Sequence, residues 1–225
     1  MSDIFDCRDE AQLLAGLRHA RRSIARGELV VLPTDTVYGV AADAFSPTAV
    51  AGLLAAKGRG RQSPPPVLVS GAPMLAALVT EVPEPIERLI SEFWPGGLTI
   101  VLPSQPSLAW DLGETHGTVA VRMPDDRVTL ELIQDAGPLA VSSANLTGRP
   151  AATSVLEAER MLRSSVKVYL DDGPSSTGIS STIVDATALA RREKDARVRV
   201  LREGAIPIER LRAVLGDVLE SEDPA

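Results

Sequence analysis

A short basic loop at residues 57–61, Lys-Gly-Arg-Gly-Arg, is the segment of this sequence best suited to bind phosphate. A lysine in the last helical turn followed by glycine is also a usual helix end, which accounts for Lys57 and Gly58. It does not account for Arg59 and Arg61, because arginines separated by glycine can fold around phosphate oxygens and bind them with two hydrogen bonds. We therefore favour phosphate binding. The loop matches neither a Walker A motif nor a dinucleotide-binding fingerprint.

The acidic residues of the chain avoid this loop. The sequence carries 23 Lys and Arg against 30 Asp and Glu, a formal net charge of −7, which argues against a protein that coats nucleic acid. From residue 44 to residue 80, however, there is no Asp or Glu. An acidic protein that gathers cations in an acid-free stretch is expected to bind an anion there.

Two further segments place polar groups directly after predicted strands. Residues 33–39, Pro-Thr-Asp-Thr-Val-Tyr-Gly, offer hydroxyls and a carboxylate for a polar substrate or a metal-bound phosphate, at the strand end where open α/β sheets bind ligands. An ordinary strand-to-helix turn explains these residues equally well. Residues 142–145, Ser-Ser-Ala-Asn, lie in a second acid-free stretch and suit phosphate or ribose, with a turn containing a left-handed asparagine as the alternative.

Arg122 adds a cation at the end of an otherwise apolar strand, residues 118–122. A cation in that position is costly unless it meets an anion, which could be a structural carboxylate or the carboxylate of a substrate. All four polar segments lie at the ends of predicted helices or strands, and we therefore expect them to line one shared cleft.

Apolar periodicity, glycine and proline predict the helices and strands that position these segments. The expected helices are residues 9–26, 48–56, 73–79, 84–93, 127–136, 153–162 and 207–215. The expected strands are residues 29–33, 67–69, 98–102, 118–122, 139–141, 167–170 and 181–185, and a further strand with one wet face around 197–200. This mixture indicates an α/β or α+β fold.

The composition favours a single domain over residues 1–220, followed by a disordered tail at 221–225. Hydrophobic residues make up 44% of the chain and aromatic residues 3%, so that the core must be aliphatic. No apolar run approaches the ~18 residues needed to span a bilayer. The N-terminus is acidic where a signal peptide would be basic, which predicts a cytoplasmic protein without a membrane partner.

Neither the cysteine nor the histidines suggest a metal site. Cys7 is the single cysteine of the chain, which excludes an intrachain disulfide and a zinc site built on paired cysteines. Its acidic surroundings do not favour a catalytic thiolate. His19 and His116 are too few for a multi-histidine centre; His19 is expected in solvent, and no flanking motif supports a triad through His116.

Seven motifs occur in the order found in a known family. They are PTDTVYG (33–39), KGR (57–59), WPGGLT (94–99), VAVRMP (119–124), SAN (143–145), STIVD (181–185) and REG (202–204). On these motifs the sequence, from about residue 27 to residue 204, resembles the YrdC family of L-threonylcarbamoyladenylate synthases. The resemblance implies an α/β (α+β) fold with a twisted, open, mixed sheet flanked by helices and a large basic cleft. It also implies the short, single-domain form of the family.

The resemblance further implies a reaction in which L-threonine, bicarbonate and ATP give threonylcarbamoyl-AMP and pyrophosphate, with Mg²⁺ as the expected metal. A partner transferase complex would then pass the threonylcarbamoyl group to adenosine 37 of tRNA. The family signature, Lys-x-Arg followed by Ser-x-Asn, matches four residues taken here as catalytic: Lys57, Arg59, Ser143 and Asn145. The implied ATP-binding residues are Lys57, Arg59, Thr118, Ser143 and Arg202, and the implied threonine-binding residues are Thr34, Arg122 and Ser181.

Elementary chemistry agrees with these roles. Attack of a carbamate on the α-phosphate of ATP builds negative charge that Lys57, Arg59 and Arg202 would stabilise, and Arg122 would clamp the threonine carboxylate. No residue stands out as a general base, so proximity would provide most of the acceleration.

The chain departs from the family pattern at the triple proline 64–66, at Ser70 and at Asp125-Asp126, which bear on the threonine pocket. The competing hypothesis is a protein of the same fold that binds RNA or nucleotide without this synthesis. The complete signature favours the enzyme, and weak RNA binding remains an expectation beside it. Carbamoyl transfer in metalloenzyme maturation would need attached zinc-finger domains, which the single cysteine excludes.

Overall fold

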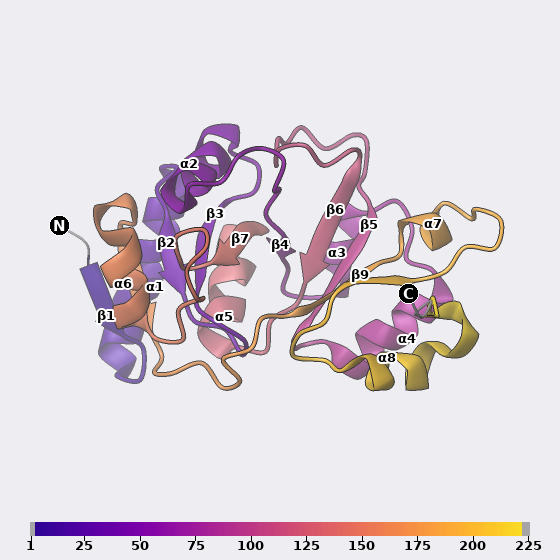
Figure 1. The fold of residues 1–225 in the computed structure, drawn as a ribbon. Helices are drawn as coiled ribbons and strands as arrows, with labels where there is room; N and C mark the ends of the chain where they lie inside the picture. The colour runs from indigo at the N-terminus through magenta and orange to yellow at the C-terminus, as the bar shows by residue number, and fades with distance from the viewer. Residues whose placement is uncertain (1–2, 222–225) are drawn as a thin grey trace.

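The computed structural model describes residues 3–221, and its strands form one sheet with the order β1-β8-β2-β3-β7-β4-β6-β5-β9-β10 (Figure 1). The strands are Asp3–Asp6 (β1), Val30–Leu32 (β2), Gly39–Asp43 (β3), Val67–Leu68 (β4), Leu98–Pro103 (β5), Thr118–Arg122 (β6), Leu139–Ser143 (β7), Val168–Asp171 (β8), Thr182–Asp185 (β9) and Arg199–Arg202 (β10). The sheet contains parallel pairs, such as β1–β8 and β5–β9, and antiparallel pairs, such as β3–β7. The predicted mixed sheet is therefore confirmed. Apart from Ser221, the predicted tail lies outside the described residues.

Eight α-helices within the described residues cover this sheet unevenly. They are Glu10–Ala25 (α1), Pro47–Lys57 (α2), Ala72–Leu78 (α3), Glu84–Phe93 (α4), Arg127–Ala136 (α5), Val155–Leu162 (α6), Thr187–Ala190 (α7) and Ile208–Leu215 (α8). Figure 1 shows α1, α2, α5 and α6 around the half that contains β1, β2, β3 and β7, whereas α3, α4, α7 and α8 lie with the half that contains β5, β6 and β9. Among the described residues, none of the helices is long and apolar enough to cross a membrane.

The first half of the sheet is covered on both faces, because its strands are apolar on both. Side chains of a strand alternate between faces, and in β2 the neighbours Val30 and Leu32 pack with α1 and α5 while Val31 packs with α2 and α6. All three of these side chains are fully buried. This continuous apolar run identified the strand from the sequence.

The second half is covered on one face only, and this asymmetry creates the cavity. Leu98, Ile100 and Leu102 of β5 are fully buried in the apolar cluster that includes α3, α4 and α8. The alternate residues Thr99 and Val101 point to the opposite face, where they line a cavity. Arg122 of β6 follows the same alternation and lines the same cavity.

The sequence did not predict β1, β3 or α7. The strand β3 is short and composed of small residues, yet it is central in the sheet and pairs antiparallel with β2 through Leu32 and Gly39. Residues 33–38 therefore connect two adjacent antiparallel strands, and the suggested strand-to-helix turn is wrong. The connection places its polar side chains at the edge of the cavity.

The helix α2 begins and ends as expected. The Ser46 hydroxyl accepts a hydrogen bond from the backbone N–H of Ala49, and Pro47 is the first helical residue. Gly58 ends the helix in the left-handed conformation, with φ of 65°, which only glycine adopts without strain. Arg59, which follows this end, lines the cavity.

Candidate active site

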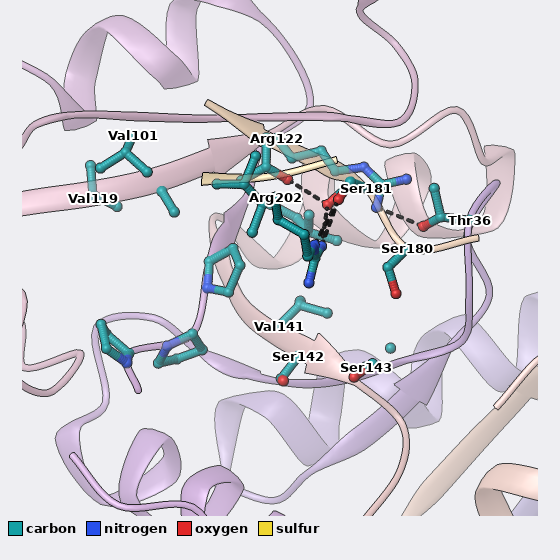
Figure 2. Close-up of a pocket in the computed structure, with 18 of the residues that line it drawn as sticks. Thr36, Val101, Val119, Arg122, Val141, Ser142, Ser143, Ser180, Ser181 and Arg202 are labelled. Carbon is teal, nitrogen blue, oxygen red and sulfur yellow. Dashed lines mark hydrogen bonds between the residues drawn. The ribbon is translucent and has the colours of Figure 1, made fainter. Parts of the chain in front are cut away.

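The cavity has a volume of about 420 Å³ and is lined by segments that are distant in the sequence (Figure 2). They are the β2–β3 connection, the loop after α2 with its triple proline 64–66, strands β5, β6 and β7, and the segments around Ser181 and Arg202. The four polar segments that we expected to share one cleft all reach this cavity. Thr34, Arg59, Thr118, Arg122, Ser143, Ser181 and Arg202 line it. Lys57 and Asn145, the other two predicted site residues, do not.

Arg122 is buried at one end of the cavity, with 7% of its surface exposed. Its Nε donates to the Gly96 carbonyl oxygen at 2.9 Å, its Nη1 donates to the Thr36 hydroxyl at 2.7 Å, and its Nη2 donates to a carboxylate oxygen of Asp35. Burial lowers the pKa of the guanidinium, and the Asp35 charge opposes that effect. The sequence left open whether Arg122 meets a structural carboxylate or a substrate. The structural carboxylate is Asp35.

Arg122 nevertheless keeps hydrogen-bonding capacity for a ligand. A guanidinium has five N–H groups, and the bonds to Gly96, Thr36 and Asp35 use three of them. One N–H on each of Nη1 and Nη2 remains without a partner among the described residues. Two such groups on one planar fork are suited to an oxyanion such as a carboxylate.

The hydroxyl of Thr34 is occupied by the protein itself. It donates to the Val37 carbonyl oxygen at 2.6 Å and accepts from the backbone N–H groups of Thr36 and Val37, each at 3.2 Å. Because Arg122 can only donate, the Thr36 hydroxyl accepts from it and can donate to Thr34 Oγ1, 3.0 Å away. These bonds stiffen the β2–β3 connection behind Arg122. Contact between Thr34 and the substrate threonine stays a prediction. Because the Thr34 hydroxyl is occupied, such a contact would use the Thr34 methyl group or backbone.

Arg59 and Arg202 are the cavity's cations without a carboxylate partner in the described part of the chain. Arg59 Nη1 approaches the Ser142 hydroxyl at 3.4 Å, and Arg202 donates to the Ser181 carbonyl oxygen through Nε and Nη2, at 3.1 and 2.6 Å. Burial lowers the pKa of Arg202, and the positive charge of Arg59 lowers it further. Because like charges repel, two arginines in one cavity without carboxylate partners are expected to bind an anion.

The Ser181 hydroxyl is held from two sides. Thr99 Oγ1 lies 2.8 Å from Ser181 Oγ, and Arg202 Nη2 lies 3.2 Å from it. Thr99 is 1% exposed and Ser181 7% exposed. Gly204 lets the segment after β10 pass close to this point, since a side chain at that position would collide with the Ser180 carbonyl oxygen. Thr118, across the cavity, donates to the Thr115 carbonyl oxygen at 2.7 Å.

The four signature residues divide into two layers. Arg59 and Ser143 line the cavity, whereas Lys57 is 1% exposed and Asn145 is 7% exposed, behind the cavity wall. The Lys57 ammonium donates to the carbonyl oxygens of Ser143 and Asn145 and to the Asn145 side-chain oxygen. The Asn145 amide nitrogen donates to the carbonyl oxygens of Leu146 and Arg149. Both side chains therefore bind the loop rather than the cavity.

The Lys57 ammonium is buried without a counter-ion among the described residues. Burial, with a smaller contribution from the charge of Arg59, lowers its pKa from 10.5 to about 8. The carbonyl oxygens of Ser143, at the end of β7, and of Asn145, in the following loop, take the place of water around the charge.

Three residues that hold the predicted ones in place were missed from the sequence: Asp35 and Thr36 at Arg122, and Thr99 at Ser181. Each belongs to a recognised motif, but the motif does not show which member contacts which partner. Arg61 lies away from the cavity, because its guanidinium pairs with both oxygens of Asp111, at 3.0 and 2.8 Å. The family signature does not include Arg61, which agrees with this position.

The acidic departure from the family pattern, Asp126, has a structural role. Its carboxylate accepts the Thr129 N–H at 2.8 Å and begins α5. Its pKa is raised from 3.8 to about 6, mainly by burial and also by the charges of Asp172 and Asp35, against the opposing effect of the hydrogen bonds from Thr129. Asp126 does not line the cavity, whereas the triple proline 64–66 does.

Cys7 and the histidines lie outside the site. Cys7 is 1% exposed, and burial raises its pKa to about 12, which disfavours the thiolate. His19 is exposed, as expected, and its ring contacts Phe5. His116 is exposed and does not line the cavity.

Known proteins resemble the chain over nearly its whole length. The family model Sua5_yciO_yrdC, described as "Telomere recombination", matches residues 22–204. A "Putative threonylcarbamoyl-AMP synthase" of Mycobacterium leprae (strain TN) is 48% identical over 218 residues, which are 97% of this chain and 96% of that protein. A protein of the same name from Mycobacterium tuberculosis (strain CDC 1551 / Oshkosh) is 48% identical over 216 residues, 96% of each chain.

A solved structure agrees in fold. The crystal structure of P. abyssi Sua5 complexed with L-threonine superposes with a TM-score of 0.85 at 32% identity. The match covers 97% of this chain and 62% of that one. The chain therefore spans less than two thirds of this longer relative, but nearly all of the mycobacterial ones.

Proposed function

The chain belongs to the family of Sua5, YciO and YrdC proteins, and from that premise we propose that it synthesises threonylcarbamoyl-AMP from L-threonine, bicarbonate and ATP, with release of pyrophosphate. The supporting observation is the set of cations that line the cavity. Arg59 and Arg202 present cations without carboxylate partners in the described structure, while Arg122 is a fork held in place by Asp35. Such a cavity offers one place for a triphosphate and another for an amino acid.

The proposed reaction has two steps. The amine of L-threonine adds to the carbon of bicarbonate and water leaves, which gives a carbamate. An oxygen of the carbamate then attacks the α-phosphorus of ATP. The bond from this phosphorus to the bridging oxygen breaks, and pyrophosphate leaves with the electron pair. The products are threonylcarbamoyl-AMP, pyrophosphate and water.

Proximity is the main source of acceleration in this proposal. Among the described residues, no His, Asp or Glu side chain lines the cavity, so no general base stands beside the reacting amine. Holding the amine, bicarbonate and the α-phosphate in one small cavity replaces encounters in solution with a preset arrangement. The enzyme's other contribution is electrostatic, because negative charge grows on the leaving pyrophosphate.

Arg59 and Arg202 are the residues that stabilise this charge, since both line the cavity and neither has a carboxylate partner among the described residues. The Ser143 side chain and Thr118 complete the nucleotide contacts. Arg122 binds the threonine carboxylate through its two remaining N–H groups, and Ser181, fixed by Thr99, contacts the rest of the amino acid. Each of these roles is a proposal built on the positions of the side chains.

Mg²⁺ enters this proposal with the nucleotide. The described residues contain no group of three or more His, Cys, Asp or Glu side chains placed to hold a metal ion. Mg²⁺ commonly keeps several waters and binds through substrate phosphates. The cavity's arginines fit a nucleotide whose metal is held by phosphate oxygens and water, and the metal would add charge stabilisation at the α-phosphate.

The product is a mixed anhydride whose threonylcarbamoyl group is activated for transfer. We propose that it is passed to a transferase complex that modifies adenosine 37 of tRNA, in a cytoplasmic setting. Weak RNA binding by this chain is a subordinate part of that proposal. The alternative, a protein that binds RNA or nucleotide without synthesis, is less favoured, because the names of the mycobacterial relatives refer to the synthase.

One assay tests the proposal directly. Purified protein is incubated with ATP, bicarbonate and Mg²⁺, and pyrophosphate release is measured with and without L-threonine, with mass spectrometry of the nucleotide product. We expect threonine-dependent release and a product with the mass of threonylcarbamoyl-AMP. Absence of threonine-dependent release refutes the synthase, and RNA binding without such release would favour the alternative.

Two arginines of the same loop provide a matched pair. Arg59→Ala should abolish the release while circular dichroism shows an unchanged fold, because Arg59 lines the cavity. Arg61→Ala should leave the release close to wild type, because Arg61 is paired with Asp111 on the surface. Equal losses in the two variants would contradict the phosphate role of Arg59.

A further inference from the structure

We propose that Lys57 is a positioning residue that fixes Arg59 relative to Ser143, and that it does not bind the phosphates of ATP. The proposal rests on the synthase activity for its catalytic consequence, but its structural part stands on the geometry of the loop. It separates the four signature residues into two that face the ligand and two that hold the first pair in place.

Lys57 connects the end of α2 to the loop after β7 through both its side chain and its backbone. The ammonium donates to the carbonyl oxygens of Ser143 and Asn145, the latter at 2.8 Å, and to Asn145 Oδ1 at 3.1 Å. The Lys57 carbonyl oxygen accepts the Thr147 N–H at 3.0 Å. An ammonium has three N–H groups, so these contacts use its whole donor capacity.

Lys57 and the carbonyl groups that it binds lie next to the residues that line the cavity. Arg59 follows Lys57 by two residues, separated by the left-handed Gly58. Ser143, whose carbonyl oxygen Lys57 binds, lines the cavity with Ser142, which Arg59 reaches at 3.4 Å. The Lys57 contacts therefore set the distance between an arginine from one segment and hydroxyls from another, 83 residues further along the chain.

A phosphate role would require Lys57 to leave these partners. The side chain is 1% exposed and does not line the cavity. Moving the ammonium into the cavity would leave the carbonyl oxygens of Ser143 and Asn145 without this donor, which is unfavourable for buried acceptors. Arg59 and Arg202 already supply cations there without such rearrangement.

Asn145 completes the support from the other side of the ammonium. Its amide nitrogen donates to the carbonyl oxygens of Leu146 and Arg149, at 3.0 and 2.7 Å, while its oxygen accepts from Lys57. The amide has no hydrogen-bonding group left to donate to a ligand. Lys57 and Asn145 thus act as one unit that shapes residues 143–149.

Hydrogen exchange of the protein without substrates tests this inference. We expect Lys57→Met to accelerate exchange of the amides in residues 143–149, among them Asn145 N–H, which donates to the Ser143 carbonyl oxygen, and Thr147 N–H, which donates to the Lys57 carbonyl oxygen. Arg59→Met is the matched control and should leave these amides at the wild-type rate, because its side chain faces the cavity. Unchanged exchange in Lys57→Met overturns the proposal. Because no catalysis is measured, the result does not depend on the synthase assignment.

Kinetics then separate positioning from phosphate binding. We expect Lys57→Met to lower kcat/KM for ATP by about 10- to 100-fold, the range that loss of charge-assisted hydrogen bonds gives. Lys57→Gln is one atom shorter and neutral, but its amide can still donate to the loop carbonyls. It should recover part of the activity and part of the exchange protection. If Lys57 instead bound the phosphates of ATP, the two variants should have equally low activity.

A double-mutant cycle with Asn145→Ala provides the last discrimination. If Lys57 and Asn145 support the same loop, the double variant should lose little more activity than either single variant. Additive losses, in which the fold-changes multiply, overturn the proposal. Should Lys57→Met fail to fold, Lys57→Gln carries both the exchange measurement and the cycle.

Discussion

Asp35→Asn offers the strictest test of the site's architecture, because it removes a charge and almost no volume. The side chains of Arg122 and Asp35 are 8% and 14% exposed, so the pair is largely out of water. Removing one partner of a buried ion pair costs about 3–5 kcal/mol, because the other charge is left uncompensated. An asparagine oxygen would keep a neutral hydrogen bond to the guanidinium, worth about 1 kcal/mol.

The net loss expected for Asp35→Asn is therefore about 2–4 kcal/mol. For chains of this length, each kcal/mol shifts Tm by about 2–4 °C, so Tm should fall by about 4–16 °C. Thermal unfolding followed by circular dichroism measures the shift, and urea denaturation gives the free energy of unfolding independently.

Asp111→Asn is the control within the same protein. Asp111 also binds an arginine through two hydrogen bonds, but the side chains of Arg61 and Asp111 are 58% and 40% exposed. Exposed pairs contribute little, so this Tm should barely change. If the two variants shift Tm equally, Asp35 is not the charge that keeps Arg122 stable in its buried position, and the proposed architecture of this end of the cavity is wrong.

Three further predictions concern the threonine end of the cavity and the start of α5. Arg122→Ala should raise the threonine KM by about 10- to 100-fold, since a charged hydrogen bond contributes about 1.5–3 kcal/mol; an effect confined to ATP would contradict the carboxylate clamp. Thr99→Val keeps the shape of the side chain but removes the oxygen 2.8 Å from Ser181. It should raise the threonine KM by about 10-fold and leave the ATP KM unchanged. Asp126→Asn should stabilise the protein at pH 7, because the buried carboxylate has a pKa raised to about 6.

The pH dependence of the Asp126→Asn variant follows from linkage. A folded pKa of about 6, against an ordinary value of 3.8, means that the native state holds the proton more tightly. The stability due to that protonated form is present below about pH 4 and is lost as pH rises through 6. The substituted asparagine can also cap α5. Tm of the variant and of wild type is measured from pH 3 to pH 8. The advantage of the variant in Tm should appear between about pH 4 and 6 and then level off. A difference in Tm that is constant over this range would contradict the raised pKa of Asp126.

The sequence predicted which segments are helices and strands better than it predicted which elements lie next to each other in the fold. Long apolar patterns such as that of α1 were sufficient to assign a helix. The small residues of β3 gave too weak a pattern to distinguish a strand from a loop. The order of strands in the sheet depends on packing between distant segments, for example β4 between β7 and β6. No local pattern encodes that order.

The same limit applies to the site. Sequence reasoning showed that Arg122 needs an anion, but Asp35, which supplies it, lies 87 residues away. The signature identified Lys57 and Asn145 by type and spacing. It could not indicate that both face the loop, because that orientation is decided by how the end of α2 meets the loop after β7.

The pairing of β1 with β8 has a consequence for how the protein is made. Asp3 pairs with Val168, and β2 also pairs with β8, through Val30. During synthesis from the N-terminus, β1 and the edge of β2 opposite β3 must wait for the chain to reach residues 168–171 before they can pair. Such non-local parallel pairing slows folding and leaves strand edges open meanwhile. We therefore expect newly made chains of this protein to depend on chaperones until β8 has left the ribosome.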